Sequence, residues 1–218
     1  MKNLKILFTA LLLTASLSAF AQYDDDESQK PKLQVRFNPL VAYDYQFRYN
    51  TDDEVCSPFM GITAGGQAYA NLGKLFVLRA GLAYKCSFSN STVAYYNLQK
   101  DDASIVEHSL ELPITFGIKI PMGKTKMHID IGPTGSLGLA STMTAHNNVL
   151  RYTEGTAYNL YDDGLAQRWN LFACGNVGFS IAERFVLSAG YRYGFFNIGN
   201  DDLPIDIHCV NATLVVNL

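Results

Sequence analysis

The residues with the clearest potential for chemistry are His108, Ser109 and Glu111, which lie close together in the sequence. A histidine beside a serine can act as its general base, and such a pair would suit ester hydrolysis. Adjacent residues of a β-strand, however, point to opposite faces, which would separate His108 from Ser109. The sequence also contains neither a Gly-x-Ser-x-Gly motif nor a closely spaced set of metal ligands. We therefore predict no enzymatic activity, no catalytic residue, no cofactor and no metal.

A larger group of charged residues recurs at alternate positions and would share the polar faces of strands. Inside a closed sheet these residues would form a network of ion pairs and hydrogen bonds, because buried charges need partners of opposite sign. A narrow path or gate for ions along the same residues is the alternative. The predicted network comprises Arg79, Lys85, Glu107, Glu111, Lys119, Asp130 and Arg192, with His128 and Arg168 on the same faces.

The segment 106–121, VEHSLELPITFGIKIP, represents the element that would position these residues. One set of alternate positions is almost purely apolar, and the other set is charged, polar or small. Strict alternation of this kind indicates a β-strand. At ~3.4 Å per residue the segment would extend for ~50 Å, and a tilted membrane-spanning strand needs only ~9–11 residues.

Seven further segments repeat the pattern. We therefore predict an all-β protein that forms an eight-stranded antiparallel up-and-down transmembrane β-barrel. A break or bulge is expected at Asn38-Pro39, because proline cannot donate a ladder hydrogen bond. The predicted strands span residues 33–47, 59–70, 75–88, 106–121, 126–140, 165–180, 185–197 and 207–218.

The connections between these strands alternate in length. Residues 71–74, 121–125 and 181–184 would be tight turns, whereas 48–58, 89–103, 141–164 and 198–206 are long and polar. Outer-membrane barrels have short periplasmic turns and longer external loops. With both chain ends in the periplasm, eight strands give three turns and four loops in this order. Segment 141–164 is predicted to be the largest external loop.

A soluble lipocalin-like barrel would show the same period with its two faces exchanged. Here the polar face is mostly Gly, Ser, Thr and Asn, which suits a crowded interior. Aromatic residues such as Phe76, Phe88, Trp169 and Phe185 lie near strand ends, as in interfacial girdles. We favour the membrane barrel, and we expect no wide pore because side chains nearly fill an eight-stranded interior.

The N-terminal residues and the composition indicate an exported protein. Lys2 and Lys5 precede an apolar run and an A-x-A site that ends at Ala21, so residues 1–21 are a predicted signal peptide. Residues 22–32 would form a flexible periplasmic lead-in, and 33–218 the outer-membrane barrel domain. A net charge of −3, from 17 Lys+Arg and 20 Asp+Glu, gives no basic footprint for nucleic acid.

The segments LELPITFGIKIP, FVLSAGYRYGFFNI and ATLVVNL, with a signal peptide that ends at Ala21-Gln22, carry a family resemblance. The chain resembles the PorT-like small outer-membrane β-barrel family (bacterial outer membrane protein β-barrel domain) over about residues 33–218. It ends in Leu218, where many outer-membrane barrels end in an aromatic residue. The resemblance implies the fold and the outer-membrane location, and its members include an accessory of protein secretion.

The expected function is that of a non-enzymatic integral outer-membrane barrel, structural or interacting through its extracellular loops, with an envelope or secretion accessory as one such role. The alternatives are an outer-membrane lipid-modifying enzyme and a soluble lipocalin-like binding barrel. Expected partners are outer-membrane lipids and lipopolysaccharide, the barrel-assembly machinery and an unidentified envelope protein, but no nucleic acid.

Four cysteines in an exported chain suggest disulfides. Cys56 and Cys86 fall near the loop end of one predicted hairpin and are the favoured pair, whereas Cys174 is the expected free thiol. Each long connection also carries an acidic pair, which we interpret as a solvated loop tip, with divalent cation binding as the alternative. The pairs are Asp52-Asp53, Asp101-Asp102, Asp162-Asp163 and Asp201-Asp202.

A specific register follows for strands 75–88 and 106–121. If their connection is centred near Tyr96, antiparallel pairing places residues whose numbers sum to about 192 opposite each other. Lys85 would then face Glu107, and Arg79 would lie one diagonal step from Glu111. We expect these four side chains to form an ion-pair ladder.

Overall fold

The computed structural model describes residues 35–50, 55–73, 75–90, 103–123, 125–146, 153–164, 166–181, 184–199 and 205–217. The predicted signal peptide and lead-in lie outside these residues. So do three of the four acidic pairs, and Asp162-Asp163 is the pair that lies within them.

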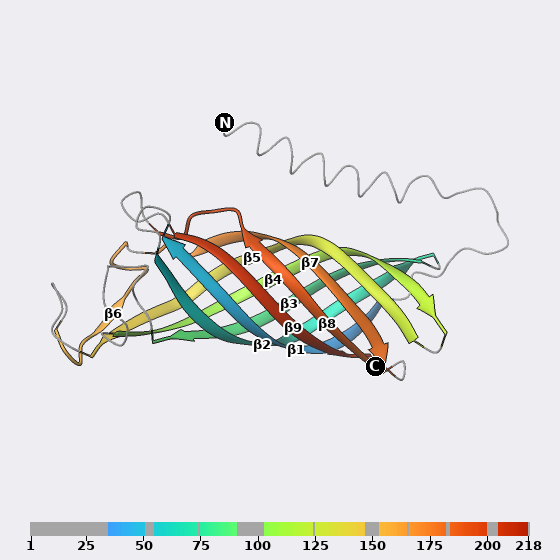
Figure 1. Ribbon diagram of the computed structural model, residues 1–218, viewed down its shortest axis with the longest axis horizontal. Coiled ribbons are helices and arrows are strands. Elements are labelled where there is room, and N and C mark those ends of the chain that lie inside the picture. The colour runs from blue at the N-terminus through green and yellow to red at the C-terminus, as the bar shows by residue number, and fades with distance from the viewer. Residues whose placement is uncertain are drawn as a thin grey trace, which may run out of the picture. The chain divides into compact units, whose positions relative to one another are not determined.

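Eight long strands follow one another along the chain and form an antiparallel sheet (Figure 1). The sheet order runs from β4 through β1, β9 and β7 to β5, and pairing of β4 with β5 closes the barrel. A ninth, short strand, β6, adds to β5 at one end. The strands are β1 (Val35–Asn50), β2 (Val55–Leu72), β3 (Phe76–Ser89), β4 (Ala103–Met122), β5 (Thr125–Ala145), β6 (Ala157–Asn159), β7 (Trp169–Ile181), β8 (Phe185–Gly194) and β9 (Ile205–Val216). The predicted fold, an eight-stranded antiparallel up-and-down barrel, is confirmed.

Two local predictions were wrong. No register shift occurs at Asn38-Pro39, because β1 pairs continuously with β2 and its ladder with β9 begins only at Leu40. The irregularity lies instead between His108 and Ser109, where the pairing of β4 with β5 shifts. The predicted long loop 48–58 is also short, since β1 continues to Asn50 and β2 starts at Val55.

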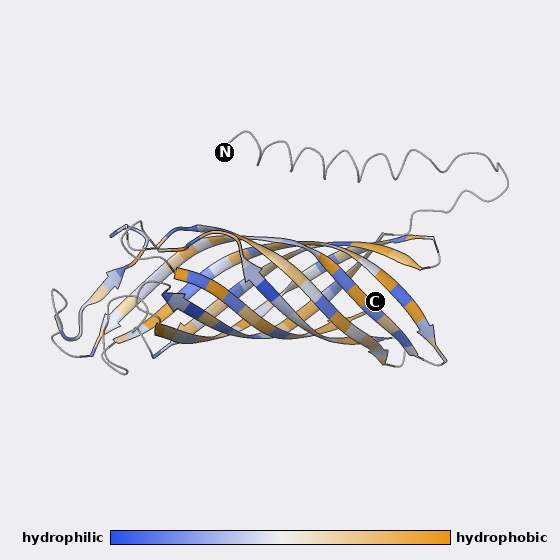
Figure 2. Ribbon diagram, turned by 45° about the horizontal axis from the view of Figure 1, so that its top comes forward, coloured by the Kyte–Doolittle hydropathy of each residue, from blue (hydrophilic) through white to orange (hydrophobic). Residues whose placement is uncertain are grey.

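Hydrophilic and hydrophobic residues alternate along the strands, as the sequence predicts (Figure 2). On β5, Ile131 is 63% exposed, whereas the preceding residue, Asp130, is 9% exposed. The same contrast holds around the barrel, so the outer surface is an apolar face suited to lipid and the polar side chains point inward. Phe76 and Phe116 stack on this outer face with ring centroids 5.5 Å apart, near one end of the strands.

The connections also differ between the two ends. Tight turns join β2 to β3, β4 to β5 and β7 to β8 at the end where β1 begins and β9 ends. Gly73 and Gly123 take positive φ values of 77° and 64° there, a conformation that glycine adopts without a Cβ clash. The longest connection joins β5 to β7 and contains β6, in agreement with the predicted position of the largest loop. No helix among the described residues is long and apolar enough to span a membrane.

Candidate functional site

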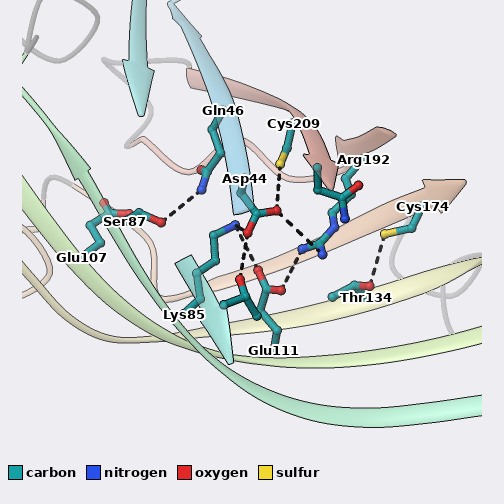
Figure 3. Close-up of polar contacts among 12 residues, drawn as sticks. Asp44, Gln46, Lys85, Ser87, Glu107, Glu111, Thr134, Cys174, Arg192 and Cys209 are labelled. Atoms are coloured by element: carbon teal, nitrogen blue, oxygen red, sulfur yellow. Dashed lines mark hydrogen bonds and ion pairs between the residues drawn. The ribbon is translucent and has the colours of Figure 1, made fainter. Parts of the chain in front are cut away.

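The barrel lumen contains the polar and charged side chains, and four of them form a central network (Figure 3). Lys85 Nζ lies 3.2 Å from Glu111 Oε1 and 3.4 Å from Asp44 Oδ2. Arg192 Nη1 lies 2.7 Å from Glu111 Oε2, and its Nη2 lies 3.8 Å from Asp44 Oδ1. The four side chains are at most 11% exposed. Two cations and two carboxylates therefore balance each other across the lumen, as buried charges require.

A second ion pair, between Arg48 and Glu107, lies closer to the long connections. Ser141 Oγ donates to Glu107 Oε1 over 3.1 Å. The Arg48 guanidinium also lies 3.7 Å from the centroid of the fully buried Phe59 ring, in a cation–π arrangement. Arg48 lies on β1, Glu107 on β4 and Ser141 on β5, so these contacts join three strands on the long-connection side of the central network.

A third ion pair, between Arg79 and Asp130, lies toward the tight turns. Arg79 Nη2 lies 3.0 Å from His128 Nδ1, and His128 Nε2 lies 2.6 Å from Ser180 Oγ. Because a guanidinium can only donate, Nδ1 must be the acceptor, which makes His128 a neutral imidazole that donates from Nε2. Gly117, opposite Asp130, leaves room for this pair, since a Cβ there would meet both side chains.

Lys119 belongs to the same lumenal face but contacts different residues. Its Nζ donates to Asn71 Oδ1 over 2.5 Å and lies 4.9 Å from the centroid of the Tyr69 ring. Arg168, in contrast, lies at the other end of the barrel with a 42% exposed side chain. Arg168 Nη2 lies 3.0 Å from Asp162 Oδ1, outside the lumenal network.

The predicted ladder between β3 and β4 was wrong in its partners. Lys85 lies opposite Ser109 rather than Glu107, and Arg79 lies opposite Thr115, a shift of two residues from the predicted register. The last residue of β3, Ser89, pairs with Ile105, so the pairing of the two strands is centred near residue 97 rather than near Tyr96. Glu111 therefore comes within diagonal reach of Lys85, while Arg79 pairs with Asp130 on β5.

Sequence reasoning missed two lumenal charges, Asp44 of the central network and Arg48 of the second ion pair. Asp44 is fully buried and contacts Lys85 and Arg192, and Thr63 Oγ1 donates to its Oδ2 over 2.8 Å. The signal was present, because alternate residues of β1 are polar from Asp44 to Asn50. The predicted strand ended at residue 47, which left Arg48 in a loop.

An apolar cluster of buried residues lies toward the end with the long connections. It combines lumenal residues at the strand ends with two residues from the connections, Leu160 and Ile198. Leu160 is fully buried, and its backbone N–H donates to Ser141 O over 2.9 Å. The buried members are Phe59, Ala103, Ile105, Met143, Ala145, Leu160, Phe172, Cys174, Ile198, Ile205 and Ile207. We call this group the apolar plug.

The segment after β6 holds the plug in place. Tyr161 fits over Gly138, where a Cβ would meet its hydroxyl, and the Arg168 guanidinium lies 4.8 Å from the centroid of the Tyr161 ring. Near β6, the backbone N–H of Thr153 donates to the Tyr158 hydroxyl over 2.8 Å and lowers the pKa of Tyr158. The contact of Tyr161 with Gly138 ties part of the longest connection to β5, whereas the Thr153–Tyr158 hydrogen bond lies within the connection.

The predicted Cys56–Cys86 disulfide is not formed, and all four cysteines are free thiols. Cys86 lies opposite Ile62 on β2, whereas Cys56 lies opposite Tyr49 near the start of that strand. At ~3.4 Å per residue the six positions from Ile62 to Cys56 span roughly 20 Å, and a disulfide requires Cα atoms within about 7 Å. Cys174 is free, as predicted.

The candidate hydrolytic residues do not meet. His108 is on the outer face, where its Nδ1 lies 2.5 Å from the hydroxyl of Tyr84. Ser109 lines the lumen on the other side of the sheet. Among the described residues there is also no group of three or more His, Cys, Asp or Glu that could hold a metal ion.

Known proteins with a related sequence agree with this geometry. The model of the family described as "Outer membrane protein beta-barrel domain" matches residues 20–200. The chain belongs to this family. Membership agrees with the closed barrel and its apolar outer face, and it places the protein among outer-membrane barrels.

Three solved structures are similar to this outer-membrane barrel, and the first of them shares its fold. Neisserial surface protein A is 14% identical, with 85% of this chain and 99% of that chain covered and a TM-score of 0.51. Ail of Yersinia pestis, solved with sucrose octasulfate, is 10% identical, with 85% and 100% covered and a TM-score of 0.44. The N-terminal β-barrel domain of Pseudomonas aeruginosa OprF is 10% identical, with 82% and 97% covered and a TM-score of 0.37. The comparison with curated proteins finds no match.

Proposed function

We propose that this outer-membrane barrel is a non-enzymatic, non-conducting membrane anchor that acts through its long connections. The observation that supports this most directly is the filling of the lumen by paired charges and buried apolar side chains. The central network of Asp44, Lys85, Glu111 and Arg192 crosses it, and the apolar plug fills the end beyond. Any ion would have to displace paired charges and then an apolar barrier, both of which are costly.

The long connections would face the cell exterior and contact an envelope protein. The sequence resemblance to PorT-like barrels supports an accessory role in the envelope or in secretion. The apolar outer face would contact outer-membrane lipids and lipopolysaccharide, and the barrel-assembly machinery would insert the chain after cleavage of a signal peptide behind Ala21. The mass of the mature protein tests that cleavage directly.

Conductance measurements test the proposal. Refolded protein added to a planar lipid bilayer should give no stable current steps at either polarity, whereas a porin added to the same bilayer should conduct. Reproducible single-channel currents from the wild-type protein would refute the proposed function. A lipid A mass spectrum that changes when the gene is deleted would instead support the lipid-modifying alternative.

A further inference from the structure

Two polar pairs lie on the mostly apolar outer face of the barrel. The Tyr84 hydroxyl of β3 lies 2.5 Å from Nδ1 of His108 on β4. The Tyr191 hydroxyl of β8 lies 2.5 Å from Nδ1 of His208 on β9. Tyr84 is 44% exposed and Tyr191 is 47% exposed, so both pairs are accessible from outside the barrel. Polar groups on a lipid-facing surface are costly, because hydrocarbon offers them no hydrogen-bond partner.

The two pairs have the same geometry. Leu110 lies directly opposite Tyr84, and Val210 lies directly opposite Tyr191. Each histidine lies two residues from that opposite position, on the side of the long connections. Four strands separate the two pairs in either direction around the closed sheet, so the pairs lie on opposite sides of the barrel.

The pairs also lie at a similar depth. Each tyrosine directly precedes a cation of the central network, Lys85 in β3 and Arg192 in β8, and both cations contact Glu111. From Phe76 and Phe185, the first residues of these strands, the tyrosines are roughly 15–20 Å higher along the barrel axis for a strand tilt of ~35–45°. The apolar band of such barrels is ~25 Å tall. The pairs therefore lie toward its boundary on the side of the long connections.

Each pair retains a donor hydrogen that has no partner among the described residues. A phenol and an imidazole together carry at least two donor hydrogens, and the bond between them uses one. If the tyrosine donates to Nδ1, the remaining donor is the Nε2–H of the histidine. If Nδ1–H donates instead, the remaining donor is the tyrosine O–H. No other hydrogen bond of these four side chains occurs within the described part of the chain.

We propose that each Tyr–His pair donates a hydrogen bond to an acyl carbonyl oxygen of a membrane lipid. Acyl carbonyls are the acceptors that border the hydrocarbon layer, and two sites on opposite sides of a barrel at one depth fit the surrounding lipid better than a single protein. Two such bonds would hold the barrel at a fixed depth. The inference rests on the lipid contact in the proposed function but not on the absence of conductance, so unfolding measurements and bilayer currents test the two separately.

Unfolding of the refolded full-length protein in two kinds of vesicle tests these bonds. Diester phosphatidylcholine supplies acyl carbonyls, whereas the diether analogue with the same chains and headgroup lacks them and keeps the phosphate. Tyr191→Phe with His208→Phe removes both donors of one pair and keeps two rings. We expect this double change to raise the equilibrium constant for unfolding about tenfold more in diester than in diether vesicles, the effect of one hydrogen bond. The corresponding changes at Tyr84 and His108 provide an independent test with the same expected difference.

Two controls separate the lost donor from other effects. Tyr191→Phe alone should change the equilibrium constant for unfolding by the same factor in both lipids, because His208 still carries an N–H donor. Phe76→Leu with Phe116→Leu removes a stacked pair without donors from the outer face. This double change should also have the same effect in both lipids.

The same measurements can contradict the proposal. Equal effects of the Tyr191 and His208 double change in both lipids would overturn it, because phosphate and water are present in both kinds of vesicle. A tenfold lipid difference in the phenylalanine control would also overturn it, since the effect would then come from bilayer packing. Boiled and unboiled samples of every variant should migrate differently, which separates a lost lipid contact from lost folding.

Discussion

Asp44 is fully buried, yet it is surrounded by groups that neutralise and bind it. Lys85 and Arg192 supply positive charge, and Thr63 supplies a hydroxyl donor. An ionised carboxylate without such partners would be strongly destabilised in this interior. The interior of this barrel therefore depends on matched polar groups where a soluble domain would depend on apolar packing.

Glu111 should be energetically coupled to Arg192. Glu111→Ala leaves two buried cations with Asp44 as their remaining network partner, and removal of one member of a buried pair costs ~3–5 kcal/mol. We expect the double change Glu111→Ala with Arg192→Ala to destabilise less than the sum of the single changes, with a coupling of about 1–3 kcal/mol. Urea unfolding of the refolded protein in detergent gives the required free energies.

Arg79 provides the matched control for this cycle. Arg79 pairs with Asp130, so the double change Arg79→Ala with Glu111→Ala should be additive within about 0.5 kcal/mol. A strong coupling in this control, together with additivity for Glu111 and Arg192, would mean that the register of β3 against β4 is wrong.

Gly117→Ala should destabilise the barrel by about 1–3 kcal/mol, the usual cost of overpacking. Its Cβ would collide with Asp130 and crowd Arg79, so the ion pair would have to shift. Gly175→Ala is the control, because a Cβ at Gly175 meets no atom within 4 Å. Since alanine costs less backbone entropy than glycine, this control should be neutral or slightly stabilising in the same unfolding assay. Equal destabilisation by both variants would contradict the proposed packing around Gly117.

At the scale of the strand, β4 shows how much the sequence alone could predict. Its period of two correctly assigned Glu111 to the lumen and Leu112 to the outer face, because alternation depends only on local geometry. Pairing partners depend on register, which is set where the chain turns back, and residues 91–102 of that connection offer no strong turn signal. The partner of Arg79 was therefore missed although its face was predicted.

The plug was unpredictable for a different reason. Leu160 and Ile198 lie in connections that the sequence marks as polar, and only their tertiary contacts bring them into the lumen. Likewise, the neutral role of His128 follows from the positions of Arg79 and Ser180 on two other strands. Such contacts have no signature in a local pattern.

Charge placed on the outer face of β4 should be costly at its centre and tolerated at its end. Leu112 lies near the middle of β4 and Met122 is its last residue, and both side chains are about half exposed, at 51% and 52%. Leu112→Arg should destabilise the barrel in lipid vesicles by ~2–4 kcal/mol, and Met122→Arg by ~0–1 kcal/mol. Guanidinium unfolding in vesicles measures both values. Equal effects of the two substitutions would contradict a lipid-facing outer surface.

For the whole molecule, the two ends of the barrel have different structures. Tight turns and a lumenal cavity of about 300 Å³ lie at one end, and the apolar plug and the longest connection lie at the other. Between them, each of the eight long strands has exposed large apolar side chains. A molecule built this way has a fixed orientation in a membrane, and its two ends meet different compartments.

The orientation is the last prediction. Outer-membrane barrels place short turns in the periplasm and long loops outside, so the connection between β5 and β7 should be on the cell surface. An epitope inserted beside Asn148 should be labelled by antibody on intact cells. The matched insertion beside Gly123, in a tight turn, should be labelled only after the outer membrane is permeabilised. Insertions at both sites should spare folding, because each falls outside the paired strands, and the gel shift on boiling verifies this. Labelling of the Gly123 insertion on intact cells, with the Asn148 insertion protected, would show the reverse orientation and place the lumenal cavity at the cell surface.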